Sequence, residues 1–91
     1  KTMPRKEKVT KIIDGDTFET GSRKNPVRLA NVDAPEKGQL GSAKAKGALS
    51  MLIEREEVRI DTDSHDKYDR AVANVYLGRE SVNKKMKKKL K

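Results

Sequence analysis

The hydrophobic and β-branched residues of the first third of the chain fall into three short runs, at 8–13, 17–20 and 27–32. Clusters of Gly, Asp, Ser and Pro separate these runs, a pattern typical of strands joined by turns. Side chains alternate along a strand, so apolar Leu29 and charged Arg28 are expected on opposite faces of the third run. We therefore expect three strands, with the third returning antiparallel to the second.

The middle of the chain changes to a helical period. Apolar residues recur at spacings of three and four between Ser42 and Arg55, and Ser42 is a residue type that often caps the start of a helix. Gly47 lies inside this run, where Gly weakens a helix by roughly 1 kcal/mol relative to Ala, which predicts close packing against a sheet. Residues 33–41 contain Pro and several Gly, and we expect a loop there.

The second half of the chain returns to strand patterns and ends in a helix. Residues 57–61 alternate like a half-buried strand, and residues 71–77 form a more apolar run. From Val82 to Leu90 an apolar residue recurs at every fourth position on a lysine-rich background. This spacing predicts a final helix with a single apolar stripe.

The order of three strands, a helix, two strands and a helix fits a mainly β fold. We expect a five-stranded closed barrel of the oligonucleotide-binding type (OB-fold), with a helix between strands 3 and 4 and a C-terminal helix. Closure suits short strands because it leaves no exposed edge; a split α+β sandwich is the alternative. The chain has no repeat or linker, so 1–91 is expected to be one domain with its core at about 8–84 and basic tails at 1–7 and 84–91.

The net charge of +8 is concentrated at the two ends of the chain. Residues 1–8 carry four basic side chains and one acidic side chain, residues 84–91 carry six lysines, and residues 9–83 therefore sum to −1. Basic ends serve solubility as readily as phosphate binding. Net charge alone does not identify a nucleic-acid-binding protein.

The composition also excludes several classes of protein. The chain has no cysteine, which rules out disulfides and thiolate metal sites, and no apolar run near the roughly 18 residues of a membrane span. We expect a soluble chain without a signal peptide. The compartment stays open: a native start at Met3 predicts a cytoplasmic protein, whereas processing to Lys1 predicts a secreted one.

Acidic residues gather where the first and third strands are expected to end, with Asp14 and Asp16 after one and Asp33 and Glu36 after the other. Hydrolysis of a phosphodiester needs positive charge on the non-bridging oxygens, a base for water, and donors for the developing charge. Oxygen ligands suit Ca²⁺ or Mg²⁺, and arginine grips phosphate through two parallel hydrogen bonds. Arg28 supplies one such arginine in the same neighbourhood.

Three segments resemble, in order, the conserved segments of the staphylococcal nuclease family. They are Ile-Asp-Gly-Asp-Thr at 13–17, Val-Arg-Leu at 27–29 leading into Val-Asp-Ala-Pro-Glu at 32–36, and Asp-Lys-Tyr-Asp-Arg at 66–70. The resemblance covers about residues 8–84. It implies the barrel that the strand order permits.

The resemblance also implies a Ca²⁺ cofactor. Asp16 and Asp33 would bind the ion through their carboxylates, and Ala34 would bind it through its backbone carbonyl. The family usually has Thr in place of Ala34, but a main-chain ligand survives that change. The implied reaction is endonucleolytic cleavage of DNA and RNA, preferably single-stranded or unpaired, by a monomer that leaves 3′-phosphate ends and does not bind membranes.

The same resemblance assigns roles to five further residues. Glu36 would be the general base that activates water, and Arg28 and Arg70 would hold the scissile phosphate and stabilise its transition state. Lys67 and Tyr68 match positions that contact the neighbouring phosphate. These roles are expectations carried over from the family.

Two departures from the family pattern affect this expectation. Asp69 replaces the usual Gly before Arg70, and its carboxylate is expected to pair with Arg70 and weaken the grip on phosphate. The chain has only three aromatic residues, so few bases can stack on it. Binding is then expected to depend on phosphate contacts and strongly on salt.

Several of these features also have simpler interpretations. Asp-Gly-Asp at 14–16 is on its own more typical of a turn than of a metal site. Residues 61–66 resemble the start of an EF-hand loop, but Asp66 at the sixth position and Val72 at the twelfth do not fit it. We interpret 61–66 as a solvated hairpin loop, with His65 as a loop residue. The five residues Asp16, Arg28, Asp33, Glu36 and Arg70 could also form a salt-bridge network at the rim of the barrel.

Three functions compete on this sequence. The leading hypothesis is a Ca²⁺-dependent nuclease. The alternatives are a non-catalytic OB-fold module that binds nucleic acid or protein, and a stable scaffold domain with basic ends. Substitution of Glu36 separates the first from the second, because a pure binding module does not need this carboxylate.

Overall fold

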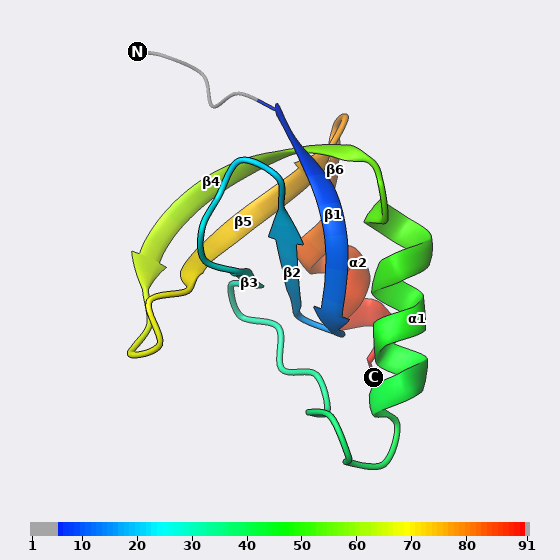
Figure 1. The fold of residues 1–91 in the computed structure, drawn as a ribbon. Helices are drawn as coiled ribbons and strands as arrows, with labels where there is room; N and C mark the ends of the chain where they lie inside the picture. The colour runs from blue at the N-terminus through cyan, green and yellow to red at the C-terminus, as the bar shows by residue number, and fades with distance from the viewer. Residues whose placement is uncertain (1–5, 91) are drawn as a thin grey trace.

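The computed structural model describes residues 6–90, which form six strands and two helices (Figure 1). Residues 1–5 of the expected N-terminal basic tail, and Lys91, lie outside the described residues. Neither helix among residues 6–90 is long and apolar enough to cross a membrane. The elements are β1 (Lys6–Asp14), β2 (Thr17–Thr20), β3 (Val27–Leu29), α1 (Ser42–Ile53), β4 (Glu57–His65), β5 (Ala71–Leu77), β6 (Glu80–Ser81) and α2 (Val82–Lys89).

The strands close into a barrel. Their order in the sheet is β3-β2-β1-β4-β5-β6, and β3 also pairs with β5 in parallel. This extra pairing joins β1, β2, β3, β5 and β4 into a ring, which confirms the five-stranded barrel. In Figure 1, α1 stands along one side of the barrel and α2 lies behind β1 and β2.

The core fills the inside of this ring and extends under both helices. Alternate residues of the strands point inward, as Val27 and Leu29 do on either side of the half-exposed Arg28. Helix α1 contributes Leu49 and Ile53 to the core, and α2 contributes Met86. The expected C-terminal helix with one apolar stripe is therefore confirmed, and Lys84–Lys89 belong to that helix rather than to an extended tail.

Two strand boundaries differ from expectation. Strand β4 continues to His65 through residues expected to form a loop, because their backbone pairs with β5 at Ser64↔Val72 and His65↔Ala71 although their side chains are exposed. Strand β3 stops at Leu29 rather than reaching Val32, because the chain turns away at Asn31, where φ is 60°. The polar composition of residues 62–65 gave no sign that β4 continues to His65. A left-handed backbone conformation at Asn31 ends β3.

The expectations for Ser42 and Gly47 were wrong. Helix α1 begins at Ser42, but Gly41 occupies the N-cap position with φ 85°, and no side chain caps the helix. Gly47 is exposed, and a Cβ there would meet nothing within 4 Å. The close approach lies instead at Gly15, where a Cβ would lie 2.6 Å from the Cβ of Ala45 and 2.8 Å from the Cβ of Ala34. Only a residue without a side chain lets the β1–β2 turn pack this tightly against α1.

Candidate active site

The turn between β1 and β2 places Asp16 in the wall of the barrel. The Asp16 backbone N–H donates a hydrogen bond to Asp14 Oδ1 at 3.1 Å, which folds the Asp-Gly-Asp segment into a tight loop. Gly15 lets this loop pack against Ala34 and Ala45. The Asp16 side chain is consequently buried, with 6% of the residue exposed.

Three donors surround the Asp16 carboxylate. The Thr17 hydroxyl donates to Oδ1 at 2.9 Å, the Ala34 backbone N–H donates to Oδ2 at 3.1 Å, and Arg28 Nη2 lies 3.4 Å from Oδ2. Burial raises the pKa of Asp16, and the neighbouring Asp14 adds to that rise, while the bonds from Ala34 and Thr17 oppose it. The buried charge is therefore only partly compensated by the described residues.

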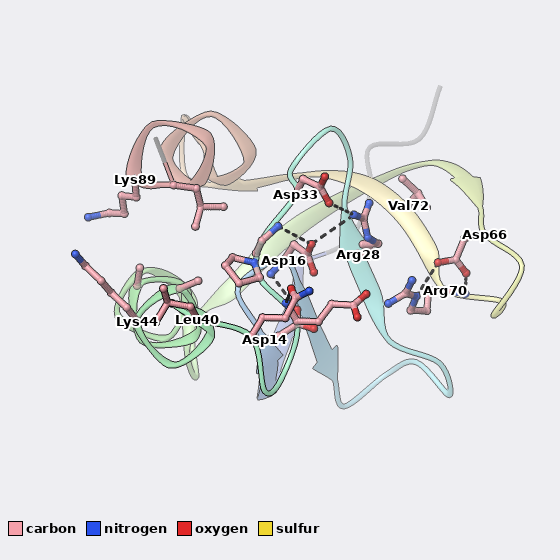
Figure 2. Close-up of a pocket in the computed structure, with 18 of the residues that line it drawn as sticks. Asp14, Asp16, Arg28, Asp33, Leu40, Lys44, Asp66, Arg70, Val72 and Lys89 are labelled. Atoms are coloured by element: carbon pink, nitrogen blue, oxygen red, sulfur yellow. Dashed lines mark hydrogen bonds and ion pairs between the residues drawn. The ribbon is translucent and has the colours of Figure 1, made fainter.

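Arg28 joins the two acidic segments that the sequence analysis singled out. Its Nη2 atom donates to the Val32 carbonyl at 3.2 Å and lies 3.4 Å from Asp16 Oδ2 and 3.6 Å from Asp33 Oδ1. The Asp33 side chain is otherwise fully exposed. One guanidinium nitrogen thus faces both carboxylates that are expected to bind the metal (Figure 2).

The carboxylate and carbonyl oxygens near Asp16 are ligands of the type that a hard cation prefers. Within residues 6–90, no three His, Cys, Asp or Glu side chains are grouped to hold a metal. A cation here would therefore combine the carboxylates of Asp16 and Asp33 with a main-chain carbonyl such as that of Ala34. Oxygen ligands of this kind, beside a buried and partly compensated carboxylate, fit Ca²⁺.

The loop between β4 and β5 is organised by Asp66. Its Oδ1 accepts hydrogen bonds from the backbone N–H groups of Tyr68 and Arg70, both at 2.9 Å, and its Oδ2 accepts one from Arg70 Nε at 2.6 Å. Burial raises the pKa of Asp66, but the bonds from Arg70 and Tyr68 outweigh it and leave that pKa below its usual value. Asp66 was predicted only as part of a solvated loop, although an acid at the head of a turn and four residues before an arginine is a recognisable signal.

Asp69 does not pair with Arg70 as expected. Its carboxylate accepts a hydrogen bond at 3.0 Å from Nδ2 of Asn25, which lies between β2 and β3. Its backbone is left-handed, with φ 62°, a conformation that glycine adopts freely and that Asp tolerates better than most residues. The replacement of the family's Gly by Asp69 therefore affects the backbone of this loop. Among residues 6–90, Arg70 pairs with the carboxylate of Asp66 alone.

Tyr68 lies in the same loop, and 66% of its surface is exposed. Lys67 Nζ lies 5.2 Å from its ring centroid, and Arg70 Cζ lies 5.3 Å from it. The cations flank the ring, so an aromatic face and two positive groups are presented together.

All eight residues expected at the site line one cleft of about 1290 Å³ (Figure 2). Glu36 reaches this cleft from the loop before α1, where its backbone N–H donates to Gln39 Oε1 at 2.7 Å. In Figure 2 the acidic cluster with Arg28 occupies the middle of the cleft, and Asp66 with Arg70 lies at one end. The structure thus gathers positions up to 54 residues apart in the sequence, from Asp16 to Arg70, around one cavity.

The family model for the staphylococcal nuclease homologue matches residues 26–89, which is more than half of the chain. The chain belongs to the staphylococcal nuclease family. Among its relatives, an uncharacterized endonuclease of Haemophilus influenzae is 40% identical over 84 residues, which cover 89% of this chain and 47% of the relative.

Two other relatives carry more specific names. A micrococcal nuclease of Shigella flexneri is 39% identical over 70 residues, covering 75% of this chain and 40% of the relative. A thermonuclease of Staphylococcus hyicus is 32% identical over 92 residues, covering 89% of this chain and 54% of the relative. The chain thus spans about half the length of these relatives.

Proposed function

We propose that this chain is a Ca²⁺-dependent endonuclease that hydrolyses phosphodiester bonds of DNA and RNA. The observation that carries the proposal is the gathering of Glu36, Arg28 and Arg70 with the buried Asp16 around one cleft. The names of the relatives, which include endonuclease, micrococcal nuclease and thermonuclease, support the same class of reaction.

The two arginines would hold the scissile phosphate. Arg70 uses Nε for Asp66, so both of its terminal nitrogens face no acceptor among residues 6–90. Arg28 is engaged only through Nη2. Each guanidinium therefore keeps donors for phosphate oxygens, and their charge would stabilise the five-coordinate transition state more than the ground state.

Glu36 would take the proton from the attacking water. The water oxygen bonds to phosphorus, the bond from phosphorus to the 5′ oxygen breaks, and the leaving oxygen takes a proton from solvent. The products are a 3′-phosphate and a 5′-hydroxyl. The exposed position of Glu36 on the loop beside the cleft is compatible with access of water.

Ca²⁺ bound by Asp16, Asp33 and the Ala34 carbonyl would neutralise charge on the non-bridging oxygens. Lys67 and Tyr68 would contact the neighbouring phosphate and its nucleotide. A single strand fits these contacts better than a duplex, because only an unpaired base can approach the exposed part of the Tyr68 ring beside Lys67 and Arg70.

The test is hydrolysis of labelled single-stranded DNA and RNA by the full chain, with Ca²⁺ and with a calcium chelator. We expect cleavage in Ca²⁺ to give 3′-phosphate ends, and the chelator to abolish it. Glu36→Gln is expected to lower the rate by roughly 10²–10⁴-fold. Glu56→Gln, an exposed carboxylate outside the cleft, is the matched control. Intact substrate together with no detectable Ca²⁺ binding would overturn the proposal.

The same assay distinguishes a nuclease from a non-catalytic binding module. Such a module would bind oligonucleotides with equal affinity in both Glu variants and would release no product. Full cleavage by Glu36→Gln would instead remove Glu36 from the mechanism while leaving a nuclease.

A further inference from the structure

The cleft continues past the acidic cluster to an end formed by the two helices. Lys44 of α1 and Lys89 of α2 both line it, and both residues are exposed. Figure 2 shows their side chains on the side of Asp16 and Asp33 opposite to Asp66 and Arg70. The helices belong to separate parts of the chain, and their contact brings the two lysines to one end of the cavity.

Neither lysine is neutralised by the described part of the chain. Among residues 6–90, Lys44 and Lys89 make no ion pair, whereas Lys85 on the same helix pairs with Glu80. A lysine without a protein partner keeps all three donors available for a ligand. The helix end of the cleft therefore presents two available positive charges.

An apolar side chain accompanies these charges. Leu40 is fully exposed and lines the cleft next to Lys44 in Figure 2. Proteins that bind single strands combine positive charge, which follows the phosphates, with aromatic side chains on which bases stack. Aromatic residues are scarce in this chain, so an aliphatic contact would take their place.

We propose that Leu40, Lys44 and Lys89 form a second subsite, which holds single-stranded DNA or RNA on the helix side of the cleft. The inference rests on the proposed function for the direction of the strand, which would run from the end at Lys67 and Tyr68 past the acidic centre to this subsite. Lys44 and Lys89 bind one phosphate each, and Leu40 covers the base between them. The subsite extends the contact beyond the scissile phosphate and its neighbour.

The test compares two double variants that remove the same charge from the same two helices. Lys44→Gln with Lys89→Gln alters the cleft, and Lys46→Gln with Lys88→Gln alters exposed lysines outside its lining. Both are made in the Glu36→Gln background, so that any hydrolysis does not disturb binding. Affinity for labelled oligothymidylates of 2 and 12 nucleotides is measured by fluorescence anisotropy at several salt concentrations.

We expect the cleft pair to weaken binding of the 12-mer roughly tenfold, and to lower the slope of log affinity against log salt by about 1.4, since each phosphate contact of a single strand contributes about 0.7. The loss is expected to be smaller for the 2-mer, which is too short to span both ends. The control pair is expected to change affinity less than threefold. Equal losses from the two pairs would show that the lysines act only as general charge, and would overturn the subsite.

Leu40→Ser tests the apolar contact separately. We expect weaker binding of the 12-mer with an unchanged salt slope, because no phosphate contact is removed. Unchanged affinity would remove Leu40 from the subsite. The proposed hydrolysis can fail while the length-dependent effect of Lys44 and Lys89 persists, and the reverse can also occur, so the two proposals are tested independently.

Discussion

Arg28 and Arg70 lie in the same cleft with similar exposure, 25% and 28% of the side chain, yet they are held in different ways. Arg28 sits on the barrel wall and shares one nitrogen among three acceptors at 3.2–3.6 Å, two of which are the expected metal ligands. Arg70 sits in a loop and makes one short bond to Asp66, which also fixes the loop backbone. In the barrel half of the site Arg28 therefore faces the two carboxylates that are expected to bind a metal. In the loop half Arg70 is held by the residue that also fixes the local backbone.

Of the substitutions that test this comparison, those of the two arginines themselves are expected to have the largest effects. Arg28→Lys and Arg70→Lys are each expected to lower the rate of hydrolysis roughly 10²–10³-fold, because lysine cannot supply a planar pair of donors. Only Arg28→Lys is expected to change Ca²⁺ affinity, measured by calorimetry, since only Arg28 faces Asp16 and Asp33. Arg79→Lys, an exposed residue outside the cleft, serves as control. Equal changes in Ca²⁺ affinity for both cleft variants would contradict the comparison.

A change at Gly15 is expected to disturb the barrel half alone. Gly15→Ala brings a Cβ to 2.6 Å from that of Ala45, and overpacking of this kind destabilises by about 1–3 kcal/mol. Gly47→Ala, in open space on the exposed face of α1, is expected to stabilise by roughly 0.5–1 kcal/mol. Urea unfolding measures both, and two changes of the same sign would refute the assignment of close packing to Gly15.

Substitution of Asp66 is expected to disturb the loop half alone. Asp66→Asn keeps an acceptor for the backbone but loses the charged bond to Arg70 Nε, so hydrolysis is expected to fall about tenfold at unchanged Ca²⁺ affinity. The folded pKa of Asp66 lies below its usual value of 3.8, so its stabilising charge is fully present above that pH and is lost as pH falls through the folded pKa. The difference in thermal midpoint between wild type and variant is expected to disappear in the same acidic range. A difference that persists unchanged there would show that the charge of Asp66 is not its source.

The smallest expected effect is a gain in stability at Asp16. Burial raises its folded pKa above the usual value of 3.8, so ionisation disfavours the folded state as pH rises past that value, and the penalty is complete above the folded pKa. Without metal, Asp16→Asn is therefore expected to raise the thermal midpoint at neutral pH and not in acid. The exposed Asp61→Asn is the matched control. A lower midpoint at neutral pH would mean that the bonds from Thr17 and Ala34 outweigh burial.

Much of the fold was predictable because its inward faces follow simple periods. Val27 and Leu29 flank Arg28 as alternation requires, and Met86 lies on the stripe that the four-residue spacing indicates. The end of β4 was not predictable in this way, since its exposed residues pair only through backbone atoms. The end of β3 at Leu29 depends on one left-handed residue, Asn31, for which the local sequence gives little signal.

The site shows the same division. Family motifs pointed to Asp16, Arg28 and Arg70, and the structure places them in one cleft. Lys89 was predicted only as one of the lysines of the basic C-terminal end, and Lys44 was not predicted at all, because each looks like an ordinary solvated residue on its own helix. Only the packing of α1 beside α2 places both lysines in the lining of the same cleft.

The parallel pairing of β3 with β5 has a consequence for when the proposed active site is completed during folding. It sets Arg28 opposite Val72, two residues from Arg70, so strand register fixes the spacing of the arginines, and a slip of one residue would shift them by roughly 3.3 Å. This contact spans more than forty residues and closes a long loop, which carries an entropic penalty before any gain. An intermediate with the other strands paired but the ring still open would have both arginines and no fixed distance between them. Recovery of the proposed nuclease activity during refolding would therefore measure the time at which the barrel closes.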